Sequence, residues 1–93
     1  MTSFNLPKDF LFGSATAALQ IEGGDKNNSW YEWCEQGHIK DGTHCKVADD
    51  HWNRVAEDVA LMRKMNHQIY RMGVEWSRIE PVKGQFSQAA LKH

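Results

Sequence analysis

The feature that most constrains the fold is one amphipathic helix between two strand-like segments. Apolar side chains within residues 50–65 recur at spacings of three, four and three, which places them on one side of a helix. They are Trp52, Val55, Val59 and Met62. Residues 10–18 and 68–76, on either side of this helix, are predicted to be strands. A strand–helix–strand order predicts two parallel strands joined by a crossover.

The ends of the predicted helix have suitable residues. Asp49 or Asp50 can cap its first turn, and Arg63 and Lys64 favour its C-terminal end. Asn66 can adopt the left-handed conformation that stops a helix. We therefore expect a helix of about four turns.

The polar segment 25–49 shows no clear periodicity and contains several turn-forming residues. We expect a long loop with one short helix around residues 30–35. Connections much longer than ~15 residues are uncommon and are usually functional. A further helix is predicted to begin at Ser87.

A parallel sheet must be covered on both faces, and this chain supplies one full helix and two strands. The 93 residues therefore cannot close such a sheet alone. We expect residues 1–93 to be the N-terminal segment of a single α/β domain that is incomplete on its own.

The composition excludes several classes of protein. The net charge is −1 and the basic residues are scattered, so nothing suggests nucleic-acid binding. No apolar run approaches the ~20 residues of a membrane span, and the N-terminus does not resemble a signal peptide. We expect a cytoplasmic location, in which Cys34 and Cys45 stay reduced.

Two groups of polar residues are candidates for a site. Gln20 and Glu22 follow the first predicted strand, at the edge where barrel folds bind ligands, although an ordinary polar strand end fits equally well. Arg71 and Glu75 lie four residues apart on the second predicted strand. This spacing corresponds to about 13 Å, which is too far for them to pair. An inward Arg71 would orient a carboxylate from elsewhere and lower its pKa, or it would form a purely structural ion pair.

A metal site, a disulfide and a nucleotide site are not expected. Zinc-binding residue types are present, but their spacings are not those of common zinc fingers. They are Cys34, His38, His44, Cys45 and His51. A disulfide between the two cysteines is sterically conceivable but not expected in a reduced compartment. The sequence "EGGD" at 22–25 is too short and too acidic for a phosphate loop.

Two blocks of this sequence resemble family 1 glycoside hydrolases, the β-glucosidase and 6-phospho-β-glycosidase family. The first is "FLFGSATAALQIEGG", at residues 10–24, which resembles the family's N-terminal signature ending in Gln-x-Glu-Gly. The second is "ADDHWNRVAEDVALMRKMNHQIYRMGVEWSRIEPVKGQFSQAAL", at residues 48–91, which contains the pattern "YRxxxxWSRIxP". The match runs in order along nearly the whole chain.

The resemblance implies a (β/α)8 TIM barrel, of which this chain supplies the first two strands and the first helix. Gln20 would bind hydroxyls of the non-reducing sugar, Trp30 would lie near the aglycone entrance, and Arg71 would contact the nucleophilic carboxylate. A retaining mechanism needs two carboxylates about 5 Å apart. The family carries them in Asn-Glu-Pro and Glu-Asn-Gly motifs, which are absent here. Glu22 and Glu75 match other positions, so no catalytic carboxylate is expected in this chain.

We therefore expect part of a retaining β-glycosidase that acts on a β-glycoside substrate without a cofactor. It would be active only with a complementary chain that supplies the carboxylates. The alternative is a non-catalytic barrel fragment that associates or binds sugar without hydrolysis.

Overall fold

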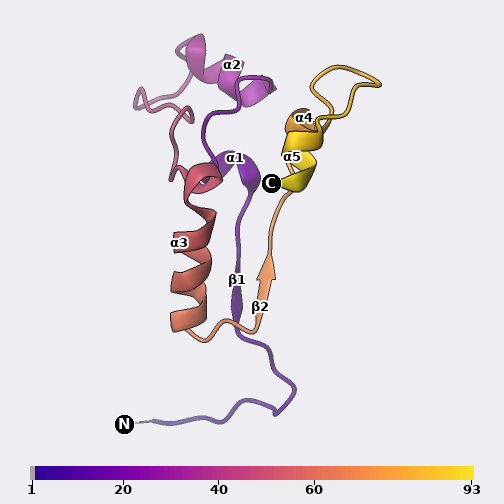
Figure 1. Ribbon diagram of the computed structural model, residues 1–93. Coiled ribbons are helices and arrows are strands. Elements are labelled where there is room, and N and C mark those ends of the chain that lie inside the picture. The colour runs from indigo at the N-terminus through magenta and orange to yellow at the C-terminus, as the bar shows by residue number, and fades with distance from the viewer. Residues whose placement is uncertain (1) are drawn as a thin grey trace.

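Two short parallel strands form the centre of the structure, a computed structural model that describes residues 2–93. Strand β1 (Gly13–Ala15) pairs with strand β2 (Ile69–Arg71), with Gly13 opposite Ile69 and Ala15 opposite Arg71. Helix α3 (His51–Lys64) lies between them in the sequence and runs alongside the pair (Figure 1). The predicted parallel crossover is confirmed.

Four short helices gather beyond the carboxyl ends of the strands (Figure 1). They are α1 (Ala18–Ile21), α2 (Ser29–Glu35), α4 (Trp76–Ile79) and α5 (Gln88–Lys92). The predicted strands at 10–18 and 68–76 were too long, because each segment is a strand only where it has the other as a hydrogen-bonding partner. Beyond that pairing, both segments turn into the helices α1 and α4.

The predicted short helix in the polar loop and the predicted helix after Ser87 are confirmed. The Asn28 side chain accepts a hydrogen bond from the Tyr31 N–H at 2.7 Å and caps α2. The Ser87 hydroxyl accepts one from the Ala90 N–H at 3.2 Å and caps α5. In both cases a short polar side chain satisfies an N–H group that has no partner within the helix.

Helix α3 ends as expected but begins differently. Asn66 has a φ of 57°, the left-handed conformation predicted for the stop, and Arg63 and Lys64 lie in the last turn. Asp50 occupies the N-cap position, but its φ is 54° and its side chain forms no capping bond. Its carboxylate instead accepts a hydrogen bond from the Asn53 side chain at 2.8 Å. The prediction of a side-chain cap by Asp50 was therefore wrong.

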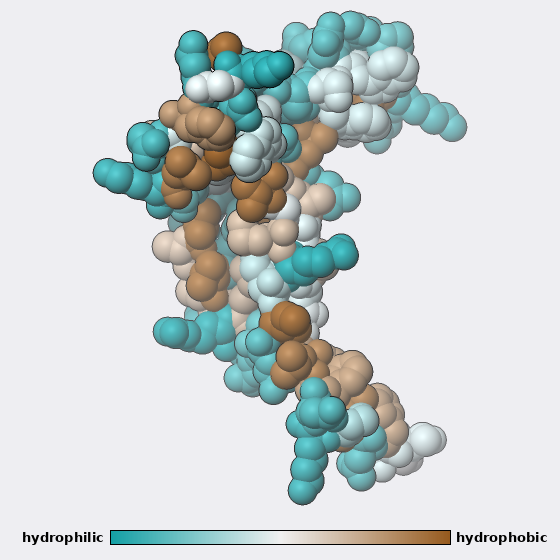
Figure 2. Space-filling model, turned by 90° about the vertical axis from the view of Figure 1, so that its right-hand side faces the viewer, coloured by the Kyte–Doolittle hydropathy of each residue, from teal (hydrophilic) through white to brown (hydrophobic). Residues whose placement is uncertain are grey.

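Little apolar surface is buried. Only three apolar residues of the described chain are buried, namely Ala18, Cys34 and Ile79. The accessible surface is 7796 Å², whereas a compact monomer of this size would expose about 5,500 Å². The radius of gyration is 17.0 Å, against about 12 Å for a compact chain of this length. Figure 2 shows apolar side chains over one face, from the upper lobes down to the N-terminal extension.

We expect the 93-residue chain, studied alone, to self-associate or to melt without a sharp transition. Two short strands with unpaired edges and so small a core cannot offset the conformational entropy lost on folding. Sedimentation and thermal melting followed by circular dichroism would test this, with the chain in urea as the unfolded control. A compact monomer with a sharp cooperative melt would contradict it.

Within residues 2–93, no helix has the length and apolar content needed to span a bilayer.

Candidate functional site

A cavity of about 390 Å³ lies between α1, α2 and the loop that follows α2. Two of the three residues predicted to contact the sugar or the nucleophile, Gln20 from α1 and Trp30 from α2, line it. The remaining lining residues are Leu19, Cys34, Ile39, Thr43, His44, Cys45 and Ala48. The fold thus brings together two residues that are ten positions apart in the sequence.

The two predicted residues present complementary chemistry to this cavity. Gln20 is exposed and lies one helical turn beyond β1, rather than at the end of the strand itself. Its amide offers both a hydrogen-bond donor and an acceptor. Trp30 is 48 % exposed, so part of its ring is free to cover an apolar surface. A mostly apolar cavity with a few polar groups is the usual form of a small-ligand site.

Arg71 does not line this cavity. It is the last residue of β2, where its backbone oxygen accepts a hydrogen bond from the Thr16 N–H at 3.0 Å. Its side chain is exposed and forms no ion pair within residues 2–93. Glu75 lies beyond the end of β2, so the two residues do not share a strand face as predicted. The Glu75 carboxylate lies 3.0 Å from the Ser77 hydroxyl oxygen.

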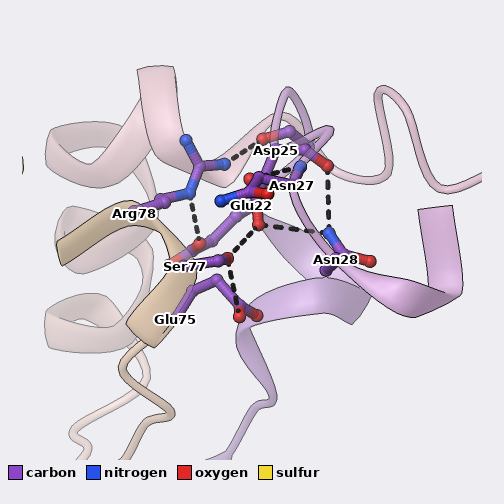
Figure 3. Close-up of polar contacts among 8 residues, drawn as sticks. Glu22, Asp25, Asn27, Asn28, Glu75, Ser77 and Arg78 are labelled. Atoms are coloured by element: carbon purple, nitrogen blue, oxygen red, sulfur yellow. Dashed lines mark hydrogen bonds and ion pairs between the residues drawn. The ribbon is translucent and has the colours of Figure 1, made fainter. Parts of the chain in front are cut away.

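A buried ion pair between Glu22 and Arg78 links the ends of the two strand segments (Figure 3). Arg78 Nε donates to Glu22 Oε2 at 3.1 Å, and the two side chains are only 13 % and 10 % exposed. The Arg78 guanidinium also donates to the backbone oxygen of Gly23 and lies 3.9 Å from the centroid of the Trp52 ring. The Arg78 charge therefore has three partners, and the Glu22 carboxylate has Arg78 as the partner that compensates its burial.

Asp25 extends this network to the start of the polar loop (Figure 3). Its carboxylate accepts hydrogen bonds from the Ser77 hydroxyl at 2.6 Å, the Asn28 side chain at 3.1 Å and the Asn27 N–H at 3.1 Å. Burial raises the pKa of Asp25, but these hydrogen bonds and the nearby Arg78 charge outweigh it and hold the pKa below its usual value. The network fixes the loop that carries Trp30 to helix α4.

Sequence reasoning gave Arg78 and Asp25 no role. Each is an ordinary charged residue in its local segment, and the partners Glu22 and Arg78 are 56 residues apart. The feature of the sequence that could have revealed this network was Glu22. Its carboxylate comes after a run of small residues, and such runs occur where backbones pack closely.

The fold gathers three of the five cysteine and histidine residues considered as metal ligands. Cys34, His44 and Cys45 place their ligand atoms within 4.8 Å of one another, and both cysteines are free thiols. Burial raises the pKa of the Cys45 thiol, and the neighbouring Cys34 raises it further. The other two lie apart: His38 stacks on Trp33, and His51 bonds to Asp58.

The sequence profile described as "Glycosyl hydrolase family 1" matches residues 2–93. The chain belongs to glycosyl hydrolase family 1. It is 39% identical over 98 residues to β-glucosidase A of Acetivibrio thermocellus, with 98% of this chain and 22% of that relative covered.

Solved structures agree with this family 1 membership. The AHE enzyme from Alicyclobacillus herbarius superimposes with a TM-score of 0.87 and 38% identity, over 99% of this chain and 22% of that one. A rice β-glucosidase, Os3BGlu6, solved in a covalent complex with glucose, gives a TM-score of 0.82 and 39% identity over 94% and 20%. These neighbours are (β/α)8 barrel enzymes, and the family 1 chain spans about a fifth of their length.

Proposed function

We propose that this chain is the N-terminal part of a retaining β-glycosidase that acts on terminal β-linked sugars. In this proposal β1, α3 and β2 are the first strand, first helix and second strand of a (β/α)8 barrel. The observation that best supports this proposal is that Gln20 and Trp30 line the same cavity. Helices α1 and α2, which carry these two residues, lie beyond the carboxyl ends of two parallel strands, the edge at which barrel enzymes bind substrates (Figure 1).

Each predicted residue has a separate role in the proposed enzyme. Gln20 donates to and accepts from hydroxyls of the non-reducing sugar, and Trp30 covers the substrate near the aglycone entrance. Arg71, on the neighbouring strand, acts as a positioning residue for the nucleophilic carboxylate. Its side chain has no ion-pair partner within residues 2–93, so it is free to pair with a carboxylate from the rest of the barrel.

The reaction itself requires residues outside this chain. In a retaining mechanism one carboxylate attacks the anomeric carbon and forms a covalent glycosyl intermediate, while a second protonates the leaving oxygen and then activates water. The covalent glucose complex of the rice relative is consistent with this mechanism for the family. The chain contains no Asn-Glu-Pro or Glu-Asn-Gly motif, so we propose that a complementary chain contributes both carboxylates.

Reconstitution tests the proposed function. The chain is co-expressed with a second chain that spans the rest of a family 1 barrel, including both carboxylate motifs, and hydrolysis of an aryl β-D-glucoside is measured. Hydrolysis is expected only when both chains are present, because neither carries the complete site.

The matched control is a complementary chain in which the glutamates of Asn-Glu-Pro and Glu-Asn-Gly are both changed to glutamine. It should still associate with this chain but should not turn over, because it lacks both carboxylates. If the unmodified pair associates without hydrolysis, the chain is a non-catalytic barrel fragment and the proposal is wrong.

A further inference from the structure

The cluster of Cys34, His44 and Cys45 has no role in the proposed sugar hydrolysis, although Cys45 lines a small pocket together with Glu22 and Arg78. Cys34 comes from α2, whereas His44 and Cys45 come from the loop that folds back beneath it. Cys34 is buried and the other two are partly buried. Two thiols and an imidazole at close range, sheltered from water, are the ligand types that zinc binds most readily.

We propose that Cys34, His44 and Cys45 form a zinc-binding site. Irregular spacings along the sequence gave no reason to expect one. The inference rests on how the loop folds, which brings ligands ten and eleven residues apart to one place.

The distance between the two sulfur atoms fits a metal-bridged pair. Cys34 Sγ and Cys45 Sγ are 3.9 Å apart. Two Zn–S bonds of about 2.3 Å at a tetrahedral angle place their sulfurs about 3.8 Å apart. A disulfide requires about 2.05 Å, so the thiols would have to approach far more closely to form one. The observed spacing therefore needs almost no adjustment to hold zinc.

The hydrogen bonds around His44 favour the tautomer whose Nδ1 carries a lone pair. Its Nε2 lies 2.7 Å from Glu35 Oε1, and its Nδ1 accepts a hydrogen bond from the Lys46 N–H at 3.0 Å. The ring therefore carries its proton on Nε2 and a lone pair on Nδ1. A histidine that binds zinc through one ring nitrogen commonly donates the N–H of its other ring nitrogen to a carboxylate. Zinc would take the Nδ1 lone pair in place of the Lys46 amide.

The net charge of the metal-bound site and its access from solvent also favour zinc binding. Zinc binding converts two thiols to thiolates, releases two protons to solvent and leaves a site with no net charge. All three ligands line the cavity of about 390 Å³ described above, so the ion can enter from solvent. The three protein ligands leave a fourth position for water.

Cobalt provides a visible probe for this site. The chain, assembled with the complementary barrel chain described above, is titrated with Co²⁺ in the presence of a phosphine reductant, and the absorption of thiolate-bound tetrahedral cobalt is recorded against the complementary chain alone. We expect one equivalent to bind and Zn²⁺ to displace it. Cys34→Ser and Cys45→Ser should each abolish the thiolate absorption or reduce it sharply.

Two matched pairs of variants distinguish a preorganised metal site from nonspecific metal binding by a flexible loop. Glu35→Gln should weaken binding about 10–100-fold through His44, whereas Glu32→Gln should not, because Glu32 bonds to Gln36 instead. His44→Gln should weaken binding at least as much as Glu35→Gln, whereas His38→Gln should leave it unchanged.

Three results would overturn the proposal. The first is the absence of thiolate–cobalt absorption in the reduced chain. The second is an equal effect of the His44 and His38 variants, which would indicate an unstructured loop. The third is formation of a Cys34–Cys45 disulfide on removal of the reductant in a chain that binds no cobalt. These measurements record metal binding and not hydrolysis, so the proposed function is tested separately.

Discussion

Replacing Arg78 with methionine is expected to lower the unfolding free energy of the proposed complete barrel by about 3–5 kcal/mol. The substitution leaves the Glu22 carboxylate, which is 10 % exposed, without the 3.1 Å bond that compensates its burial. It also removes the bond to the Gly23 carbonyl and the contact with Trp52. Urea unfolding of the wild-type and variant complexes would measure the loss.

Two further variants show whether the loss comes from the uncompensated charge. Adding Glu22→Gln to Arg78→Met should recover much of the stability, because no buried charge is then left unpaired. Glu57→Gln removes an exposed ion pair with Arg54 at 3.5 Å and should cost less than about 1 kcal/mol. If Arg78→Met cost no more than Glu57→Gln, the network would not stabilise the fold.

In the reconstituted enzyme, Gln20→Ala and Arg71→Met should each remove about 2–4 kcal/mol of transition-state stabilisation, as expected for the loss of one preorganised polar contact. Gln20 acts through sugar hydroxyls whose hydrogen bonds strengthen as the ring flattens, so turnover should fall together with binding. Arg71 acts through its charge on the nucleophile. Its loss should raise the pKa of that carboxylate and shift the acidic limb of the rate profile to higher pH.

Kinetics with complete and deoxy aryl glycosides across a range of pH would separate the two roles. The Gln20→Ala defect should vanish for a substrate that lacks the contacted hydroxyls, and the Arg71→Met defect should persist. Arg71→Lys keeps the positive charge but loses the bidentate geometry of the guanidinium. The acidic limb should therefore return to its wild-type position. Wild-type profiles for both Gln20→Ala and Arg71→Met would show that the two residues are structural.

Local patterns predicted α2, α3 and α5 but missed the short helices α1 and α4. The spacing of apolar residues placed α3 within one residue at each end, and Asn66 stops it in the predicted left-handed conformation. Ser87 caps α5, and the short helix in the polar loop is present. These features depend on side chains a few positions apart, which is the range that periodicity and capping rules describe.

The strands and the polar network depend on distant partners and were predicted less well. A strand exists only where another supplies hydrogen bonds, so β1 and β2 are limited to the three residues at which they pair. Glu22 has an arginine from α4 as its partner, and no local pattern links the two. The zinc proposal depends in the same way on a loop that folds back on itself.

The polar loop has one further consequence, for protein engineering. Its two ends are held together, because the Gly24 N–H donates to the Lys46 oxygen at 2.8 Å and the Trp52 N–H donates to the Glu22 oxygen at 3.2 Å. For a flexible loop closed in this way, doubling the length costs only about 0.6 kcal/mol in closure entropy. The segment after Asn28 and before Lys46 can therefore be exchanged without losing the bonds that close the loop, although the exchange removes Trp30 and the proposed zinc site. Graft libraries at this position would reshape the wall beside Gln20 while the strands beneath it keep their register.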